Sequence, residues 1–481
     1  MGFTGLDYLI LVLYLAGTVA FGAYLGRGNK DINDYFLGGK KMPWWAISFS
    51  IVATETSTLT FIGAPTIAYA GNLAFLQVAA GYLIGKVLVS FVLIPGYFRG
   101  EIQTAYEILN ERFGGRVRRL SALLFQTTRM LADGVRLFAT ALVLGVVTQM
   151  SDVTTIVIIG LVTILYTYYG GMTAVVWNDV IQLLIYLAGA GIAFYLILEG
   201  IPGGWSEVAA VAAPDRKLQW IDFRWDLSIP YTFWSGLIGG AFLTFATHGT
   251  DQMMVQRYLA CGDRKKSQLA LIVSGVFVIF QFLLFLLIGV LLFAFYRHFP
   301  MTTQMTQNDQ IFPIFIVEQI PSGVSGFIIA AVFAAAMSSL SSSLNSLASS
   351  AVNDFYRPFF KPGADSGHYL MVSRVLTLMW GVLLMGVAFL ARSWGDVLEV
   401  GLTITSITMG SILGIFLLGT LTRRTRESAG LAAMAAGLAA MLGVVYLTAL
   451  AWPWYVLVGT FVTCATGLTA ERILQAFAPK G

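Results

Sequence analysis

The stretch from Pro43 to Ala70, and above all its centre ATETSTLT (residues 53–60), decides the fold. It belongs to an otherwise apolar run that would reach about 42 Å as one continuous helix, well beyond the ~30 Å hydrocarbon core of a bilayer. Hydroxyls and a carboxylate are costly at membrane depth unless they face protein groups or water. The sequence therefore predicts a membrane helix that unwinds here, where free carbonyls can hold a cation and a half-helix N-terminus an anion.

The composition of the whole chain is that of a polytopic membrane protein. Of its 481 residues 57% are hydrophobic and 11% are charged, with a mean hydropathy of +0.77, whereas soluble domains carry about 25% charged residues. The net charge of +4 does not indicate nucleic-acid binding, because Lys and Arg lie mostly in short loops between apolar spans. No catalytic triad, phosphate loop, redox motif or cluster of metal-binding cysteines and histidines is present in the sequence, so an enzyme is not expected. The lipid bilayer is an expected partner.

The sequence predicts about thirteen transmembrane helices. The apolar spans cover residues 6–26, 43–70, 73–98, 120–149, 153–170, 175–199, 231–255, 267–296, 323–352, 369–391, 396–421, 428–450 and 453–475. The first span is followed by Arg27 and preceded by no basic residue, so we expect the N-terminus outside and the C-terminus in the cytoplasm. The expected location is the plasma membrane, the inner membrane of a bacterium. Two longer outer segments, Ile201 to Pro230 and His298 to Ser322, are predicted to form short helices.

The middle ten spans predict an inverted repeat. Five spans in each half is an odd number, so the two halves enter the membrane from opposite faces. The predicted segments are a leading helix with its inner loop (1–42), a first five-helix repeat (43–200), an outer loop (201–230), an inverted second repeat (231–421) and two C-terminal helices (422–481). The first helix of the second repeat has its own polar interruption, TFATHGTDQ (residues 244–252). Matching breaks in two halves point to a binding site near the membrane midplane.

The ninth span contains the sharpest polar pattern, AAMSSLSSSLNS (residues 335–346). Positions 335, 338, 339, 342, 346 and 349 recur at spacings of three and four, which places hydroxyls on one stripe of a helix. Small residues of this kind also let helices pack closely, and that is the alternative interpretation. Because sodium prefers oxygen ligands, so many serines facing a broken helix favour a sodium site.

Other ionisable residues fall within the predicted spans. Asp179 follows a Gly-Gly turn near a helix N-terminus, where it is either a capping acid or a cation ligand. In the fourth span Arg129, Asp133 and Arg136 are spaced i, i+4 and i+7, and one carboxylate cannot neutralise both arginines. One arginine can reach the inner surface; alternatively, Arg129 faces the cavity and receives a carboxylate. His248 is expected to be a hydrogen-bonded structural histidine.

At this point the sequence resembles a known family. GGMTAVVWNDVIQ (170–182), SSLSSSLNS (338–346) and TFIG (60–63) together are similar to the motifs of the sodium:solute symporter family, over essentially the whole chain. The family includes sodium-coupled carriers of glucose, sialic acid, proline and multivitamins. The resemblance implies an all-α, LeuT-type 5+5 inverted repeat with an added leading helix, and uptake by alternating access driven by inward sodium flow.

The resemblance also implies binding residues. The principal sodium site is expected at the backbone carbonyls of Ala53, Thr56 and Ala335 with the hydroxyls of Ser338 and Ser339. A second site, present in only some members, is similar to Asp179, Ser338, Ser341 and Ser342, so one or two sodium ions are expected. Substrate contacts are expected at Ser57, Thr60, Gln77, Arg129, Thr244, Thr247 and Gln281, with Arg136 as the alternative to Arg129.

Two departures from the sugar carriers bear on the substrate. Thr60 stands where they have a glutamine that grips hydroxyls, and Thr247 stands where they have an aromatic inner gate. The expected solute is therefore a small carboxylate, such as a sialic acid, a monocarboxylate or an amino acid. A sodium-coupled sugar or polyol carrier and a transporter-like membrane sensor are the alternatives.

Overall fold

The computed structural model describes residues 3–301, 305, 308–392, 397–422 and 425–477. In these ranges the chain consists of helices joined by irregular segments. The helices of the first half are α1 (Gly5–Leu25), α2 (Ile32–Leu37), α3 (Trp44–Glu55), α4 (Thr58–Ala70), α5 (Leu76–Val92), α6 (Ile94–Tyr97), α7 (Glu107–Arg112), α8 (Gly115–Thr148), α9 (Asp152–Gly200) and α10 (Gly204–Ala212). Those of the second half are α11 (Gly240–Gly249), α12 (Gln252–Cys261), α13 (Arg264–His298), α14 (Ile311–Gln319), α15 (Val324–Ser350), α16 (Arg357–Phe359), α17 (Ser366–Ala391), α18 (Val397–Leu421), α19 (Glu427–Leu447) and α20 (Tyr455–Ala476).

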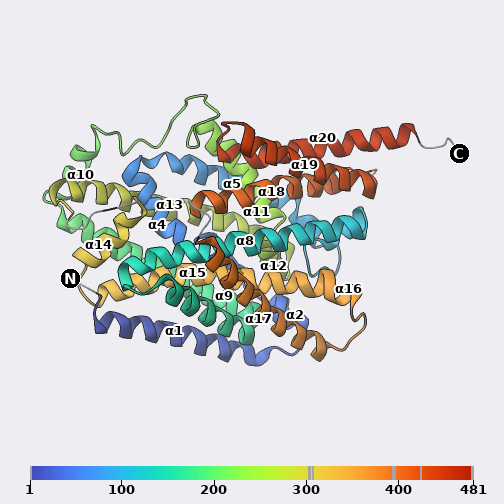
Figure 1. Cartoon of the computed structure of the whole chain (residues 1–481), viewed down its shortest axis with the longest axis horizontal. Coiled ribbons are helices and arrows are strands. Elements are labelled where there is room, and N and C mark those ends of the chain that lie inside the picture. The colour runs from blue at the N-terminus through green and yellow to red at the C-terminus, as the bar shows by residue number, and fades with distance from the viewer. Residues whose placement is uncertain (1–2, 302–304, 306–307, 393–396, 423–424, 478–481) are drawn as a thin grey trace.

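Each predicted apolar span coincides with one of these helices or with a broken pair. Among the described residues, nine helices are long and apolar enough to cross a membrane, and the bent pair of α3 and α4 makes a tenth candidate. Of these nine, α9 holds two predicted spans, and the other predicted spans lie on α8 and on α11 with α12. The long helices run roughly along one direction, with α10, α14 and the N-terminus at one end and α16 and the C-terminus at the other (Figure 1).

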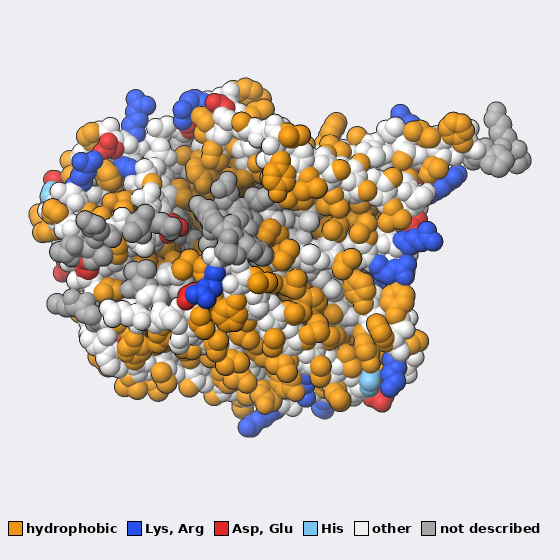
Figure 2. Space-filling model, in the orientation of Figure 1, with side chains coloured by type: hydrophobic (Ala, Val, Ile, Leu, Met, Phe, Trp, Pro, Cys, Tyr) orange, Lys and Arg blue, Asp and Glu red, His pale blue; other side chains and the backbone are white. Residues whose placement is uncertain are grey.

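The surface agrees with a bilayer environment. In Figure 2 hydrophobic side chains cover much of the visible middle of the molecule, while most Lys and Arg side chains gather toward its two ends. Large apolar side chains such as Leu13, Phe91 and Phe461 are more than half exposed, as expected of residues that contact lipid. The two predicted outer segments do contain short helices, α10 and α14, although residues 302–304 and 306–307 lie outside the described part.

The fifth and sixth predicted spans are joined by one glycine. Gly171 has φ 58° and ψ −153° inside α9, a backbone conformation that only glycine adopts readily. A Cβ atom at this position would lie 2.5 Å from the carbonyl oxygen of Tyr35. The predicted tight turn is therefore confirmed, and its length is set by a single residue.

A buried carboxylate joins α1 to the start of α15. Asp7 is fully buried and accepts hydrogen bonds from the backbone N–H groups of Gly323 (2.7 Å) and Gly326 (2.8 Å) and from the hydroxyl of Ser325 (2.8 Å). It also accepts from the backbone N–H of Thr4 at 2.8 Å. One carboxylate thus satisfies N–H groups at the N-termini of two helices, which is a favourable place for negative charge.

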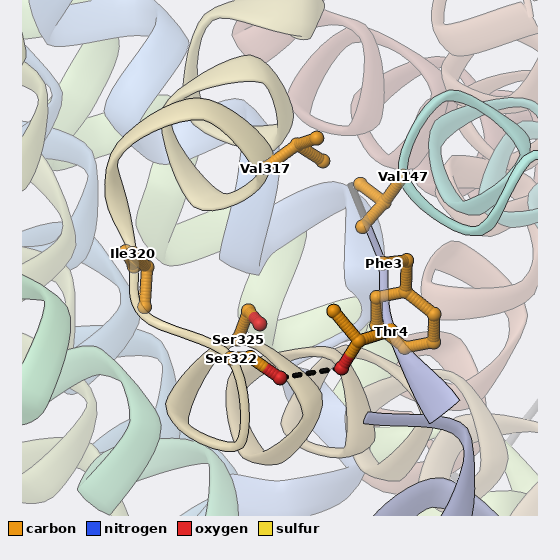
Figure 3. Close-up of a pocket in the computed structure, with 7 residues that line it drawn as sticks. All are labelled: Phe3, Thr4, Val147, Val317, Ile320, Ser322 and Ser325. Atoms are coloured by element: carbon orange, nitrogen blue, oxygen red, sulfur yellow. Dashed lines mark hydrogen bonds between the residues drawn. The ribbon is translucent and has the colours of Figure 1, made fainter. Parts of the chain in front are cut away.

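A cavity of about 280 Å³ lies beside this joint (Figure 3). Its lining residues are Phe3, Thr4, Val147, Val317, Ile320, Ser322 and Ser325. The hydroxyls of Thr4 and Ser322 are hydrogen-bonded to each other. The lining contains none of the predicted binding residues, so this cavity is separate from the expected site.

Candidate cation and substrate site

The first broken helix has the predicted interruption. The helix α3 ends at Glu55, α4 begins at Thr58, and their axes differ by 63°. Between them Thr56 (φ −91°, ψ 107°) and Ser57 (φ −101°, ψ 174°) are extended. The last carbonyls of α3 and the N-terminus of α4 therefore meet at the break, where one end attracts cations and the other anions.

The second broken helix is interrupted at Thr250 and Asp251, between α11 and α12. Asp251 caps α12, because its carboxylate accepts a hydrogen bond from the backbone N–H of Met253 at 2.9 Å. The predicted interruption at residues 244–252 is confirmed and falls at its C-terminal end. Both breaks lie in the first membrane-spanning helix of their respective predicted repeats.

The serine row of α15 faces the end of α3. The hydroxyl of Ser338 donates to the carbonyl of Ala53 at 2.7 Å, and that of Ser339 donates to the carbonyl of Thr54 at 3.1 Å. All of these residues are buried, as is Ala335 one turn earlier on α15. The arrangement gathers hydroxyl and carbonyl oxygens, the ligands that sodium prefers. The carbonyl of Thr54 was not among the expected ligands.

A guanidinium lies at the expected second sodium site. Arg257 donates from Nη2 to the carboxylate of Asp179 at 2.8 Å and to the hydroxyl of Thr54 at 2.5 Å, and the same nitrogen contacts Ser342. Ser50 donates to the same carboxylate oxygen at 2.5 Å. Arg257 lies just beyond the predicted span 231–255, yet α12 extends to Cys261 and the Arg257 side chain is only 1% exposed.

The two other serines expected at the second site make hydrogen bonds within their own helix. The hydroxyls of Ser341 and Ser342 donate to the carbonyl of Ser338 at 3.1 and 2.8 Å. The second oxygen of the Asp179 carboxylate, Oδ1, is buried without a hydrogen-bond partner among the described residues. The expected oxygen ligands of the second site are thus close together, and the guanidinium of Arg257 lies beside them.

The charges of the fourth predicted span are balanced differently from the expectation. Arg129 donates from Nε to the carboxylate of Asp251 at 2.8 Å, and its Nη2 contacts the same oxygen. Arg136 donates to Asp133 at 2.7 Å, and Asp133 also accepts from Ser343. In this structure Arg129 is therefore paired with Asp251 and does not present a free guanidinium. A sequence signal for this partner exists, since Asp251 lies within the second break.

The expected substrate residues divide into two groups. Ser57 and Thr60 lie at the N-terminus of α4, and Gln281 joins the same break because its side-chain amide donates to the hydroxyl of Thr56. Gln77, by contrast, is bound to backbone groups of the outer segment, donating to Tyr231 at 3.2 Å and accepting from Asp222 at 3.1 Å.

The two threonines of α11 have contacts outside the first break. Thr244 is 2% exposed and packs against α5 at Gly85, where a Cβ atom would lie 2.7 Å from the Thr244 Cβ. The hydroxyl of Thr247 donates to the Leu243 carbonyl at 3.0 Å and lies 3.1 Å from the ring nitrogen Nδ1 of His248. Glu55, at the end of α3, forms an ion pair with Lys86 of α5 at 2.6 Å.

Comparison with known proteins places these features in a family. A family profile described as "Sodium:solute symporter family" matches residues 35–437. The sodium/sialic acid symporter NanT of Aliivibrio fischeri is 31% identical over 476 residues, covering 97% of this chain and 93% of that protein. SiaT of Proteus mirabilis, also a sodium/sialic acid symporter, is 30% identical and covers 98% and 96%. The human sodium/iodide cotransporter is 30% identical over 91% of this chain and 69% of its own length.

Solved structures give the same picture. A sodium-coupled sialic acid symporter in a substrate-bound, outward-open state matches with a TM-score of 0.90 and 30% identity, covering 99% of both chains. Mhp1, a nucleobase-cation-symport transporter in a closed conformation, matches with a TM-score of 0.59 at 16% identity, covering 92% of this chain and 94% of that one. The second similarity concerns the fold alone.

Proposed function

This chain belongs to the sodium:solute symporter family and is a multi-pass, sodium-coupled solute symporter with the LeuT-type fold, and we propose that it imports a small carboxylate. Import proceeds by alternating access, with the N-terminus outside and the C-terminus in the cytoplasm. The observation that carries the proposal is the contact of Ser338 and Ser339 with the carbonyls at the end of α3.

Sodium binds where those oxygens converge. An ion at this position would take the carbonyls of Ala53 and Thr54 and the hydroxyl oxygens of Ser338 and Ser339 in place of the two hydrogen bonds. Because α3 and α15 belong to different predicted repeats, the ion joins the first broken helix to the second repeat. Sodium drives transport only if this arrangement binds it more tightly in one conformation than in the other.

A single sodium ion is supported better than two. The second position already contains the Arg257 guanidinium, which pairs with Asp179 at 2.8 Å and contacts Ser342. A sodium ion there would have to displace the buried Arg257 guanidinium or share the Asp179 carboxylate with it. In both cases two positive charges would compete for one carboxylate in a poorly solvated site. We therefore assign the coupling ion to the Ser338–Ser339 site.

The carboxylate is recognised at the N-terminus of α4. Ser57 and Thr60 offer hydroxyls there, and the helix end favours negative charge. The relatives named above carry sialic acid or iodide, which are anions at neutral pH, and a sodium-coupled monocarboxylate transporter of Mus musculus is 30% identical. Arg136 is the second recognition group, since its side chain is 29% exposed and, among the described residues, only Nη1 makes a hydrogen bond.

Uptake into proteoliposomes under an imposed inward sodium gradient tests the proposal. Radiolabelled N-acetylneuraminate, lactate, proline and glucose serve as probes, each with sodium and with potassium in its place. Sodium-dependent accumulation of at least one of the three carboxylates, without glucose accumulation, is the expected result. Accumulation of glucose alone would favour the sugar carrier, and sodium-independent accumulation of every probe would contradict coupling.

A further inference from the structure

Three ionisable side chains meet next to both helix breaks. Glu55 is the last residue of α3, and its Oε2 lies 2.6 Å from the Lys86 ammonium of α5 and 3.5 Å from Nε2 of His248 on α11. Lys86 and His248 are 0% and 3% exposed, whereas the Glu55 side chain is 13% exposed. Lys86 also donates to Ser274 at 3.1 Å. A partly buried carboxylate thus faces two basic side chains, although one positive charge is enough to neutralise it.

The hydrogen bonds around His248 fix which ring nitrogen bears the hydrogen. The Thr247 hydroxyl donates its only hydrogen to the carbonyl of Leu243 at 3.0 Å. It can therefore only accept from His248, whose Nδ1 lies 3.1 Å away, so Nδ1 carries the hydrogen. In the neutral ring Nε2 then has a lone pair, and it is buried without a hydrogen-bond partner in the part of the chain that the structure describes. The lone pair lies near a carboxylate oxygen, and both groups are acceptors.

We propose that Nε2 of His248 is a proton-binding site, and that its proton is donated toward the carboxylate of Glu55. The proton comes from water and forms an imidazolium, while Glu55 remains ionised between two cations. Without the proton the cluster of Glu55, Lys86 and His248 is neutral, and with it the cluster has one net positive charge. Proton binding removes the unfavourable approach of two acceptors, Nε2 and the Glu55 carboxylate oxygen, because both His248 nitrogens become donors.

The surrounding charges leave this change in charge uncompensated. Asp251, just after α11, is paired with Arg129. The hydroxyl of Tyr258 on α12 donates to the carbonyl of His248, and that of Tyr97 on α6 donates to the carbonyl of Gly249. Residues 404–421 of α18 contain no ionisable side chain.

On α20, Glu471 accepts a hydrogen bond from the backbone N–H of Arg426 at 2.7 Å. Tyr82, on the same helix as Lys86, and Tyr186 of α9 are further titratable neighbours of Glu55. Among these groups, His248 is the one whose side-chain type ordinarily exchanges a proton near neutral pH, so it is the site proposed for the change in charge.

The position connects the proton to the solute. Glu55 lies two residues before Ser57, and His248 directly follows Thr247, so the cluster adjoins predicted substrate contacts on both broken helices. A net positive charge here favours an anion at the N-terminus of α4. This second step rests on the proposed carboxylate substrate, and it predicts that uptake weakens as pH rises and His248 loses its proton.

Nuclear magnetic resonance tests the proton site without any substrate. The chain has three histidines, so ¹⁵N-labelled imidazoles give three sets of ring signals, and His248→Gln identifies the set that belongs to residue 248. Wild-type protein in detergent is expected to show an Nδ1–H neutral ring at high pH that becomes doubly protonated between pH 8 and pH 5. A ring that stays neutral throughout, or a neutral ring with its hydrogen on Nε2, would overturn the proposal.

A matched pair of carboxylate variants tests the partner. Glu55→Gln is expected to abolish the second protonation of His248 in this pH range, because the imidazolium loses the charge that stabilises it. Glu101→Gln removes the carboxylate of the exposed Lys40–Glu101 pair and is expected to leave the His248 signals unchanged. Equal behaviour of the two variants would show that Glu55 is not the partner. Thermal unfolding of each variant establishes that it is folded.

Transport at several pH values tests the link to the solute. Sodium-driven uptake of lactate and N-acetylneuraminate is expected to fall about tenfold or more from pH 5.5 to pH 8 in wild-type proteoliposomes and to lose this dependence in His248→Gln. The control His368→Gln should keep the wild-type profile, since the His368 ring is hydrogen-bonded to Tyr356 and not to the cluster of Glu55, Lys86 and His248. An unchanged profile in His248→Gln contradicts the link, whereas absence of uptake of N-acetylneuraminate, lactate and proline at every pH contradicts the carboxylate substrate instead.

Discussion

The guanidinium of Arg257 lies 2.8 Å from the carboxylate of Asp179, a residue 78 positions earlier in the sequence. Both side chains are almost completely buried, and the same guanidinium nitrogen contacts Thr54 on α3 and Ser342 on α15. The pair therefore holds α12, the second half of the second broken helix, against three other helices. An inward opening that moves α12 would have to break it.

Removing one charge of this pair is expected to destabilise the protein severely. Asp179→Asn leaves Arg257 buried without its carboxylate, which should cost about 3–5 kcal/mol in the free energy of unfolding. Asp222→Asn, at the exposed Arg224–Asp222 pair, is the control and should cost less than about 1 kcal/mol. Thermal unfolding in detergent measures both. Adding Arg257→Met to Asp179→Asn should restore part of the loss, and a double variant less stable than Asp179→Asn would contradict a simple charge pair.

Loss of one hydroxyl at the sodium site is expected to weaken sodium stimulation. Ser339→Ala removes the group that contacts the Thr54 carbonyl, so the sodium concentration for half-maximal uptake should rise roughly tenfold, or ~1.4 kcal/mol. Ser346→Ala is the control, because this hydroxyl donates to the Ser343 carbonyl on its own helix at 3.0 Å. Sodium titrations of uptake distinguish the two. Identical titration curves for wild type and Ser339→Ala would remove the assignment.

The two arginines of α8 are expected to behave differently. Arg136→Gln should lower the affinity for a transported carboxylate by about 1.5–3 kcal/mol, the range for a hydrogen bond to a charged group, while sodium stabilisation persists. Arg129→Gln should chiefly lower the unfolding temperature, because Asp251 then loses its buried partner. Equilibrium binding and thermal unfolding of both variants provide the comparison. Normal binding in Arg136→Gln would exclude direct recognition.

The turn in α9 is expected to tolerate no side chain. Gly171→Ala must adopt φ 58° and ψ −153° and places its Cβ 2.5 Å from the Tyr35 carbonyl, so a loss of more than about 1–3 kcal/mol is expected. Gly191→Ala on the same helix has no atom within 4 Å of the added carbon and should be neutral or stabilising. Unfolding temperatures and the yield of folded protein measure the difference. Equal stability of the two variants would mean that the turn can rearrange.

The helices and their breaks could be predicted from sequence because those signals are local. The polar residues between Ala53 and Thr60 conflict with their apolar surroundings, and the conflict is resolved at Thr56 and Ser57. Gly171 likewise marks its own turn, since the backbone conformation there excludes other residues.

The charge partners could not be predicted in the same way because they depend on distant contacts. Arg257 resembles a loop residue in a hydropathy pattern, since α12 also contains Gln252 and Gln256, yet all of α12 is buried. Its polar side chains are satisfied by groups far along the chain, such as the Gln103 carbonyl that accepts from Gln252 at 3.0 Å. Hydropathy measures the cost of burying such groups but not the partners that offset it.

The carboxylate of Asp7 has a practical consequence for following the transport cycle. Because it bonds the backbone of Gly323 and Gly326, the N-terminal end of α1 keeps a fixed distance to the start of α15. A spin label or fluorophore near residue 5 would then serve as a stationary reference, against which a second label on α4 or α12 reports only the displacement of the broken helices.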